Sequence, residues 1–341
     1  MSSLYKENII IALQKLSKFM ASPNLAFTKV IEDANHTNGW FTVSEVNKAL
    51  LSLSEMLDKS DLEQWFQHIT VNEKPKRVGL ILAGNIPLVG FHDVICVLAT
   101  GNIAMIKMSS SDDKLLPALL NELIVYEPTL AKYIVYVERL KDYDAIIATG
   151  SNNSARYFDY YFGKMPNIIR KNRNSLAVLN GKESVQDLRF LGNDIFDYFG
   201  LGCRNVSKLY VPKGYDFTQF FEAIEIYQPI INHFKYNNNY DYNKSIYLVN
   251  GVKHLDNGFL LVKEDEGMIS PLAVLFYEEY SSISELEAQL NAHNEQIQCV
   301  ATHLNLNISK QTLGFGQSQQ PKLWDYADNV NTIDFLGTLH G

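Results

Sequence analysis

The chain has 341 residues, of which 46% are hydrophobic and 20% charged. This length and composition predict a folded protein of about two domains with a large buried core. The formal net charge of −8, with no basic stripe to offset it, argues against a protein that binds a nucleic-acid backbone.

The cysteines and the start of the chain indicate the compartment. Cys96, Cys203 and Cys299 are odd in number, far apart and without metal-ligand spacing, so we expect neither a disulfide framework nor a metal site. The first residues lack the pattern of a signal peptide, and no apolar run reaches transmembrane length. The sequence therefore predicts a soluble cytoplasmic protein without membrane insertion.

The first seventy or so residues read as helical. Ile9, Leu13, Leu16 and Met20 recur at helical spacing, and Thr42 to Glu45 has the pattern of a capping box that begins a further helix. Such apolar stripes are usually core packing, and we assign them no chemistry.

From Arg77 onward, short apolar runs alternate with helical stretches. The expected strands are Val78–Leu82, Ile103–Lys107, Ile134–Val137 and Ala145–Ala148, and the expected helices are Leu88–Leu98, Lys114–Leu123 and a stretch near Lys141. This alternation predicts a doubly wound parallel sheet with crossover helices. Ligands of such sheets bind beyond the carboxyl ends of the strands.

The segments that follow these strands are small, polar or rich in glycine, as a cofactor crevice requires. They are residues 83–87, 107–112 and 149–152. Neither a Gly-x-Gly-x-x-Gly motif nor a Walker sequence is present. A dinucleotide at this edge would therefore bind without the common fingerprint.

The remainder of the chain predicts a second α/β domain. We expect strands at Leu176–Leu179, Leu209–Val211, Ile246–Val249, Leu260–Val262, Leu272–Phe276 and Cys299–His303, and helices at Phe217–Ile226 and Ile283–Ala292. The biased segment Tyr236–Asn243 is interpreted as a surface loop or hairpin. The fold class is thus α/β, with two doubly wound Rossmann-like domains and a helical N-terminal region.

One cysteine stands in a segment suited to nucleophilic chemistry, Gly200-Leu201-Gly202-Cys203-Arg204-Asn205. A thiolate that attacks a carbonyl needs an open backbone and nearby donors for the resulting oxyanion. The glycines supply the first, and Asn85 is a candidate for the second. A single cysteine in such a segment, taken alone, is more often an ordinary buried cysteine than a nucleophile.

Four segments in order make the nucleophile the better interpretation. They are Leu82 to Pro87, Leu98 to Lys107, Thr149-Gly150-Ser151 and Gly202-Cys203. Together they resemble the aldehyde dehydrogenase superfamily, and within it the acyl-CoA reductases related to the reductase subunit of bacterial luminescence systems. The resemblance covers roughly residues 35 to 336. It implies a cofactor-binding domain at 1–175 that includes the N-terminal helices, a catalytic domain at 176–312, and a segment at 313–341 that returns to the cofactor domain or to an oligomer interface.

The resemblance also implies roles for particular residues. Cys203 matches the nucleophile, and Asn85 matches the amide donor of the oxyanion hole. The remaining matches concern the cofactor: Lys107 on the adenosine ribose, Ser109 beside a 2′-phosphate, Gly150 and Ser151 under the pyrophosphate, and Glu266, in a loose counterpart of the Glu-x-Phe-Gly-Pro loop, on the nicotinamide ribose. The implied cofactor is NADPH, with NADH left open.

One departure bears on the reaction. Hydrolytic members of the superfamily carry a water-activating glutamate upstream of the cysteine, and the alignment puts Arg170 near its place. No acidic residue occurs between Asp159 and Glu183. Without a base, water is a poor nucleophile, whereas a thiol such as coenzyme A is partly ionised near neutral pH.

The sequence therefore predicts NAD(P)H-dependent reduction of an acyl-CoA or acyl-protein thioester to the aldehyde. The partners implied by the resemblance are that thioester, an acyl-protein synthetase and further copies of the chain. Two alternatives stay open: a hydrolytic aldehyde dehydrogenase, and a catalytically silent scaffold subunit of an acyl-transfer complex.

Overall fold

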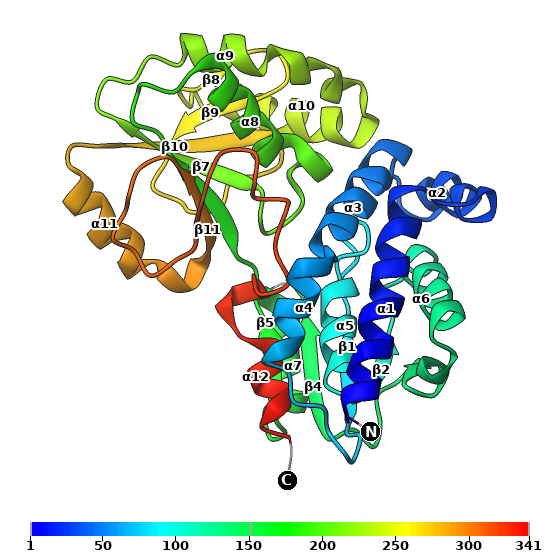
Figure 1. Cartoon of the computed structure of the whole chain (residues 1–341). Coiled ribbons are helices and arrows are strands. Elements are labelled where there is room, and N and C mark those ends of the chain that lie inside the picture. Colours follow the sequence, from blue (N-terminus) through cyan, green and yellow to red (C-terminus); the bar gives the residue numbers. More distant parts are fainter. Residues whose placement is uncertain (1, 151, 340–341) are drawn as a thin grey trace. The chain divides into compact units, whose positions relative to one another are not determined.

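The computed structural model describes residues 2–150 and 152–339 and divides the chain into two compact units. Unit 1 comprises Met1–Asn172 and Gln320–Gly341, and unit 2 comprises Arg173–Gln319. Each unit has its own sheet and its own hydrophobic core (Figure 1).

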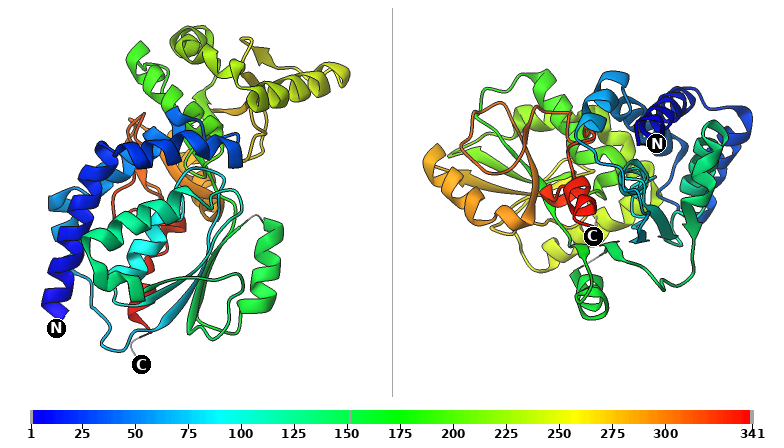
Figure 2. Two further views of the ribbon diagram at one scale, coloured as in Figure 1. Left: turned by 90° about the vertical axis from the view of Figure 1, so that its right-hand side faces the viewer. Right: turned by 60° about the horizontal axis from the view of Figure 1, so that its bottom comes forward.

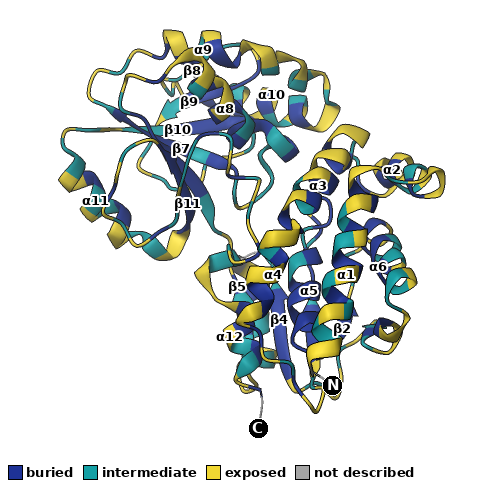
Figure 3. Cartoon of the chain, viewed as in Figure 1, coloured by how far each residue is buried: buried dark blue, intermediate teal, exposed yellow. Residues whose placement is uncertain are grey.

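Unit 1 begins with four helices, α1 (Ser2–Ala21), α2 (Leu25–Thr37), α3 (Val43–Met56) and α4 (Lys59–Gln67). The predicted apolar stripe of α1 is buried in the core of unit 1. The Thr42 hydroxyl accepts a hydrogen bond from the Glu45 N–H at 3.3 Å, so α3 begins at the predicted residue. Figure 3 shows each of α1 and α3 with an exposed and a buried face, and the predicted stripe lies on the buried face.

The sheet of unit 1 has five parallel strands in the order β3-β2-β1-β4-β5. The strands are β1 (Arg77–Ile81), β2 (Ile103–Lys107), β3 (Ile134–Tyr136), β4 (Ala145–Thr149) and β5 (Asn167–Arg170); the connecting helices are α5 (Phe91–Ala99), α6 (Leu115–Tyr126), η1 (Pro128–Lys132) and α7 (Asn152–Phe162). Right-handed crossovers place α5 and α6 on one face and α7 on the other, as Figure 2 shows. The order of the strands reverses between β1 and β4, so this is the switch point of a doubly wound sheet.

Residues 320–339 return to unit 1, where they form η5 (Ala327–Asn329) and α12 (Thr332–Gly337). Leu323 and Leu336 are fully buried in the same core as the N-terminal helices. The Trp65 indole N–H donates to the Tyr326 hydroxyl at 2.8 Å. The end of the chain is therefore an integral part of the first core.

Unit 2 has seven strands in the order β12-β11-β6-β7-β10-β9-β8, parallel except for the β8–β9 pair. Its strands are β6 (Asn174–Val178), β7 (Val206–Pro212), β8 (Leu255–Asp256), β9 (Leu261–Glu264), β10 (Val274–Tyr280), β11 (Ile297–Thr302) and β12 (Thr312–Leu313); its helices are α8 (Val185–Phe196), η2 (Asp197–Gly200), α9 (Thr218–Ile224), η3 (Glu225–Asn232), α10 (Phe234–Val249), α11 (Ile283–Ala292) and η4 (Asn294–Gln296). Alternate residues of β7 join two different cores, Leu209 and Val211 with α8 and α9, Tyr210 with α11. The sheet is therefore covered on both faces, as expected for a doubly wound domain.

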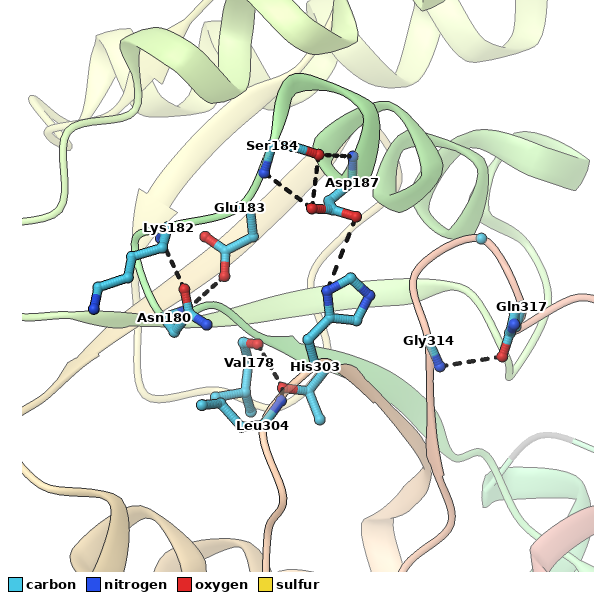
Figure 4. A network of polar contacts seen from close by, with 12 residues as sticks. Val178, Asn180, Lys182, Glu183, Ser184, Asp187, His303, Leu304, Gly314 and Gln317 are labelled. Carbon is cyan, nitrogen blue, oxygen red and sulfur yellow. Dashed lines mark hydrogen bonds and ion pairs between the residues drawn. The ribbon is translucent and has the colours of Figure 1, made fainter.

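A polar network closes the carboxyl edge of this sheet (Figure 4). The Glu183 carboxylate accepts from the N–H groups of Asn180 and Gly181 at 2.6 and 3.1 Å. Ser184 and Asp187 form a capping box that begins α8, and Asp187 lies 3.9 Å from His303, which follows β11. These side chains therefore build the turn from β6 into α8.

Two predictions for unit 2 are wrong, and both concern α10. Tyr236–Asn243 was interpreted as a loop or hairpin and Ile246–Val249 as a strand, but both segments lie within this helix. Its buried residues Tyr236, Tyr240, Asn243 and Tyr247 are spaced four, three and four apart. That is a helical period, which the run of asparagines disguises as turn composition.

A third prediction fails in unit 1, where a helix was expected near Lys141. Residues 137–144, all of them described, contain no helix and link β3 directly to β4. The segment crosses the sheet with Leu140 packed over Gly79, and the Asp144 carboxylate accepts from the Arg77 N–H at 2.7 Å. Strands β5, β8 and β12 and helix α7 were not predicted. Among residues 2–150 and 152–339, no helix has the length and apolar character needed to cross a membrane.

Candidate active site

Three of the predicted residues lie at one edge of the unit 1 sheet. Asn85 follows β1, Lys107 ends β2 and Gly150 follows β4, and these three strands are neighbours in the order β2-β1-β4. Because the strands are parallel, their carboxyl ends share an edge, and the switch point lies between β1 and β4. The side chains of Asn85 and Lys107 are exposed there.

The loop that carries Asn85 packs directly against the loop after β2. A Cβ atom at Gly84 would lie 2.6 Å from Ser109 Oγ, so only glycine permits this approach. The buried Asn38 amide donates to the carbonyls of Gly84 and Ser111, at 3.2 and 3.4 Å. One side chain from the end of α2 thus holds both loops.

A buried carboxyl group holds the other end of the Asn85 loop. Asp112 accepts from the Leu88 N–H at 3.0 Å, and Leu88 has a φ of 59°, in the left-handed region. Burial raises the pKa of Asp112 to about 6. This contact holds a backbone conformation that leucine rarely adopts.

Gly150 lets the end of β4 pack closely against α7. A Cβ there would lie 2.8 Å from Ser154 Cβ and from Phe158 Cε2 on α7. A glycine before a crossover helix is what a pyrophosphate requires of the backbone. Ser151, which we paired with Gly150, lies outside the described residues, and Ser109 is half-buried.

Cys203 lies in unit 2, in the loop between η2 and β7, at the amino edge of its sheet. Its side chain is exposed, whereas Cys96 and Cys299 are buried. Burial raises the pKa of both buried thiols, so they stay protonated. Cys96 and Cys299 are therefore ordinary buried cysteines, whereas Cys203 is not.

The main chain around Cys203 is held by side chains that the sequence did not single out. The buried Ser175 hydroxyl donates to the Cys203 carbonyl at 3.1 Å and lies 3.0 Å from Cys299 Sγ. Asn205 binds the peptide of Gly202. Asn205 belongs to the segment from Gly200 to Asn205 that the sequence indicated, but only its tertiary contacts show its role.

The strand after Cys203 also holds the loop that carries Glu266. Lys208 on β7 is 0% exposed, and its ammonium group donates to the Glu266 carbonyl at 3.0 Å and pairs with Glu278 at 2.6 Å. The Ser207 hydroxyl donates to the Met268 carbonyl at 3.3 Å. The Glu266 side chain itself is exposed. A lysine within an apolar strand was the signal in the sequence that could have indicated this contact.

Arg170, which the sequence comparison placed near the position of the missing glutamate, is engaged within unit 1. It ends β5, is buried, forms an ion pair with Asp93 of α5 and donates to the Thr332 hydroxyl of α12 at 3.1 Å. The nearest acidic residues in sequence are also engaged. Asp159 faces Lys171 at 4.0 Å, and Glu183 binds two backbone N–H groups.

Comparison with protein families gives one match. The profile of the acyl-CoA reductase (LuxC) family matches residues 44–218, more than half of the chain, including the segments with Asn85, Lys107, Gly150 and Cys203. The chain belongs to this family. Membership makes it an oxidoreductase that acts on acyl-CoA, as the motifs predicted.

Solved structures extend the likeness of fold over the whole chain. Aldehyde dehydrogenase KauB from Pseudomonas aeruginosa is 14% identical with a TM-score of 0.66, covering 98% of this chain and 82% of its own. An indole-3-acetaldehyde dehydrogenase in complex with NAD+ is 12% identical with a TM-score of 0.65, at the same coverages. An NADP-dependent enzyme from E. coli is 12% identical with a TM-score of 0.65, covering 91% and 77%. At these identities the likeness shows the fold alone, and it confirms the predicted aldehyde dehydrogenase-like architecture. No curated protein matches the chain.

Proposed function

We propose that this acyl-CoA reductase converts an acyl-CoA thioester into the aldehyde with NADPH, through an acyl group carried on Cys203. The observation that supports this most is the exposed thiol of Cys203 on a turn whose main chain is held by buried side chains. Neither of the other two cysteines offers an accessible sulfur.

In the first step the Cys203 thiolate attacks the thioester carbonyl carbon, a C–S bond forms, and the bond to the coenzyme A sulfur breaks. The leaving thiolate takes up a proton from solvent. From the family resemblance we assign the side-chain amide of Asn85 and the N–H of Cys203 to the oxyanion of the tetrahedral intermediate. Loss of one such donor lowers a rate by roughly a hundred- to a thousandfold.

The residues at the carboxyl edge of unit 1 fit a nicotinamide dinucleotide. Gly84 and Gly150 allow the loops after β1 and β4 to pack closely, and Lys107 at the same edge is exposed. When bound, the nicotinamide supplies the hydride that reduces the acyl group. We assign Gly150 and Ser151 to the pyrophosphate, Lys107 to the adenosine ribose and Glu266 to the nicotinamide ribose.

NADPH is proposed over NADH because of the loop after β2. Residues 107–111 contain one lysine and three serines and no acid. Lys107 and Ser109 can bind a 2′-phosphate by charge and hydrogen bond, whereas an NAD-selective loop commonly presents a carboxylate to the 2′-hydroxyl.

The acyl-enzyme is proposed to yield aldehyde and no free acid. Hydrolysis needs a base to deprotonate water, and the residue near the place of that base is Arg170, paired with Asp93. The same chemistry serves an acyl-protein thioester supplied by a synthetase partner, which we propose as a second donor. A homo-oligomer is proposed from the family resemblance.

The proposal is tested with an acyl-CoA series of increasing chain length, by following NADPH oxidation and identifying the product. Cys203→Ala should abolish both turnover and the release of one equivalent of coenzyme A without NADPH, and Cys299→Ala should retain both. Free acid as the product would favour the hydrolytic dehydrogenase. Failure to bind NADPH or NADH would favour the scaffold subunit.

A further inference from the structure

The residue two positions after the nucleophile closes the turn on which Cys203 stands. Asn205 is 3% exposed. Its side-chain carboxamide oxygen accepts from the Gly202 N–H at 2.8 Å, and its backbone N–H donates to the Gly202 carbonyl at 3.0 Å. The backbone N–H and C=O groups of Gly202 are thus both bound within the turn, and the Cys203 side chain is exposed.

The side-chain nitrogen of Asn205, Nδ2, binds a different element. It donates to the carbonyls of Asp194 and Asp197 at 3.1 and 2.8 Å, and Ile195 O lies at 3.5 Å. These carbonyls lie at the C-terminal end of α8, where helical carbonyls lack partners within the helix. Asn205 therefore caps α8 and ties it to the nucleophile turn.

The backbone between these two contacts is strained. Tyr198, Phe199 and Gly200 follow one another with φ of 53°, 56° and 78°. A non-glycine residue in this region costs about 1–3 kcal/mol and persists only where its surroundings hold it. Asn205 binds the chain on both sides of this run, at Asp197 and at Gly202.

The end of α8 that Asn205 binds is itself held. The Asp194 side chain is 0% exposed and accepts from the N–H groups of Gly316 and Ser318 at 2.7 and 3.0 Å. The nucleophile turn is thus bound to a helix end that the segment after β12 secures.

We propose that Asn205 is the positioning residue of the nucleophile: by binding both backbone groups of Gly202 it fixes the following peptide, whose N–H belongs to Cys203, in the orientation that the oxyanion requires. This rests on the proposed role of Cys203. The position calls for a short side chain with one acceptor and two donors, which is what a carboxamide offers. Aspartate has the same shape but would place acceptors against carbonyl oxygens.

The test uses the full chain and the variants Asn205→Asp, Asn205→Ala and Asn205→Ser. The first readout is the rate of coenzyme A release in a single acylation without NADPH. The second is alkylation of Cys203 by iodoacetamide, followed by mass spectrometry, because alkylation forms no oxyanion. A displaced catalytic group costs about a hundredfold in rate. We expect acylation to fall by about that factor while alkylation of Cys203 and the affinity for NADPH stay near those of the native protein.

The matched control is Asn257→Ala in the β8–β9 hairpin. Asn257 accepts from the N–H groups of Phe259 and Leu260 at 3.2 and 2.9 Å, and β8 is three positions from β7 in the sheet. This variant loses main-chain contacts of the same kind, and its acylation rate should not change.

Protection of the buried thiols of Cys96 and Cys299 from alkylation shows that a variant is folded. Asn205→Ser is the mildest of the three variants, because it keeps an oxygen for the Gly202 N–H. Acylation at the native rate in a folded variant overturns the proposal. Loss of alkylation in parallel with acylation also overturns it, since the thiol itself would then be impaired. Failure of the proposed function would give a different result: the Cys203→Ala variant would still release coenzyme A.

Discussion

Four buried polar side chains hold the main chain of the two segments that carry Asn85 and Cys203. Asn38 and Asp112 bind the loop of Asn85, and Ser175 and Asn205 bind the turn of Cys203. All four use their polar atoms on backbone groups, so the two segments are held before any substrate arrives. Such preorganisation is what a site that stabilises an oxyanion needs.

At the same scale, Asp194 should make stability depend on pH. Burial raises its pKa from 3.8 to about 6, so folding disfavours the ionised form. The contribution of this group is therefore greatest below pH 4 and is lost as the pH rises through 6. At about 1.4 kcal/mol per pKa unit, the loss is about 3 kcal/mol.

Asp194→Asn removes this titration. We expect the free energy of unfolding of the native protein, minus that of the variant, to fall by about 2 kcal/mol between pH 4 and pH 7, because in this range the folded native protein binds a proton that the unfolded chain does not. Urea unfolding across this range measures it, with Asp216→Asn, an exposed carboxyl, as the control. A difference that does not vary with pH would contradict the assignment.

Among elements, one buried ion pair joins three parts of unit 1. Arg170 ends β5, Asp93 lies in the first turn of α5, and Thr332 begins α12. The side chains of the pair are 7% and 5% exposed. Charges in such surroundings are costly unless both are present. Arg170 therefore joins β5, α5 and α12.

Breaking this pair should cost far more than replacing it. Arg170→Met leaves the Asp93 carboxylate buried without its partner and should lower the free energy of unfolding by about 3–5 kcal/mol. The double variant Arg170→Met with Asp93→Leu should recover most of that loss. Equilibrium unfolding in urea gives the three values, and losses that simply add would refute a coupled pair.

For the whole molecule, the first core is closed by the end of the chain. Leu323, Ile333 and Leu336 are buried in unit 1 beside helices from the first hundred residues. Residues 313–319, by contrast, belong to unit 2, where Gly316 and Ser318 bind Asp194. The last thirty residues thus contribute to both cores in turn.

Ending the chain after residue 319 should therefore destabilise unit 1 selectively. Burial of a leucine or isoleucine contributes about 1.5–3 kcal/mol, so losing three such residues removes a stabilisation comparable to that of a whole domain. We expect the shortened protein to lose NADPH binding and to become sensitive to protease within residues 1–172. Limited proteolysis with mass spectrometry measures this, and a shortened chain that binds NADPH with native affinity would disprove the dependence.

Local pattern was sufficient to predict much of this protein. The strands β1 to β4, β6, β7 and β9 to β11, the fold class and the helix that begins after Thr42 were predicted because apolar period and capping are local properties. The family was predicted from four short motifs in order. Helix α10 was missed because its buried tyrosines alternate with asparagines, so that composition obscured the helical period.

By itself, then, the sequence determined the fold class, the reductase chemistry and Cys203 as the proposed nucleophile, because residue type and order carry that information. The tertiary structure decided what holds these residues. The contacts of Asn205 with the end of α8, of Asp112 with Leu88 and of Arg170 with Asp93 and Thr332 join residues 8 to 162 positions apart. Such pairs leave no periodic pattern in a single sequence, since their partners meet only when the sheets and helices pack.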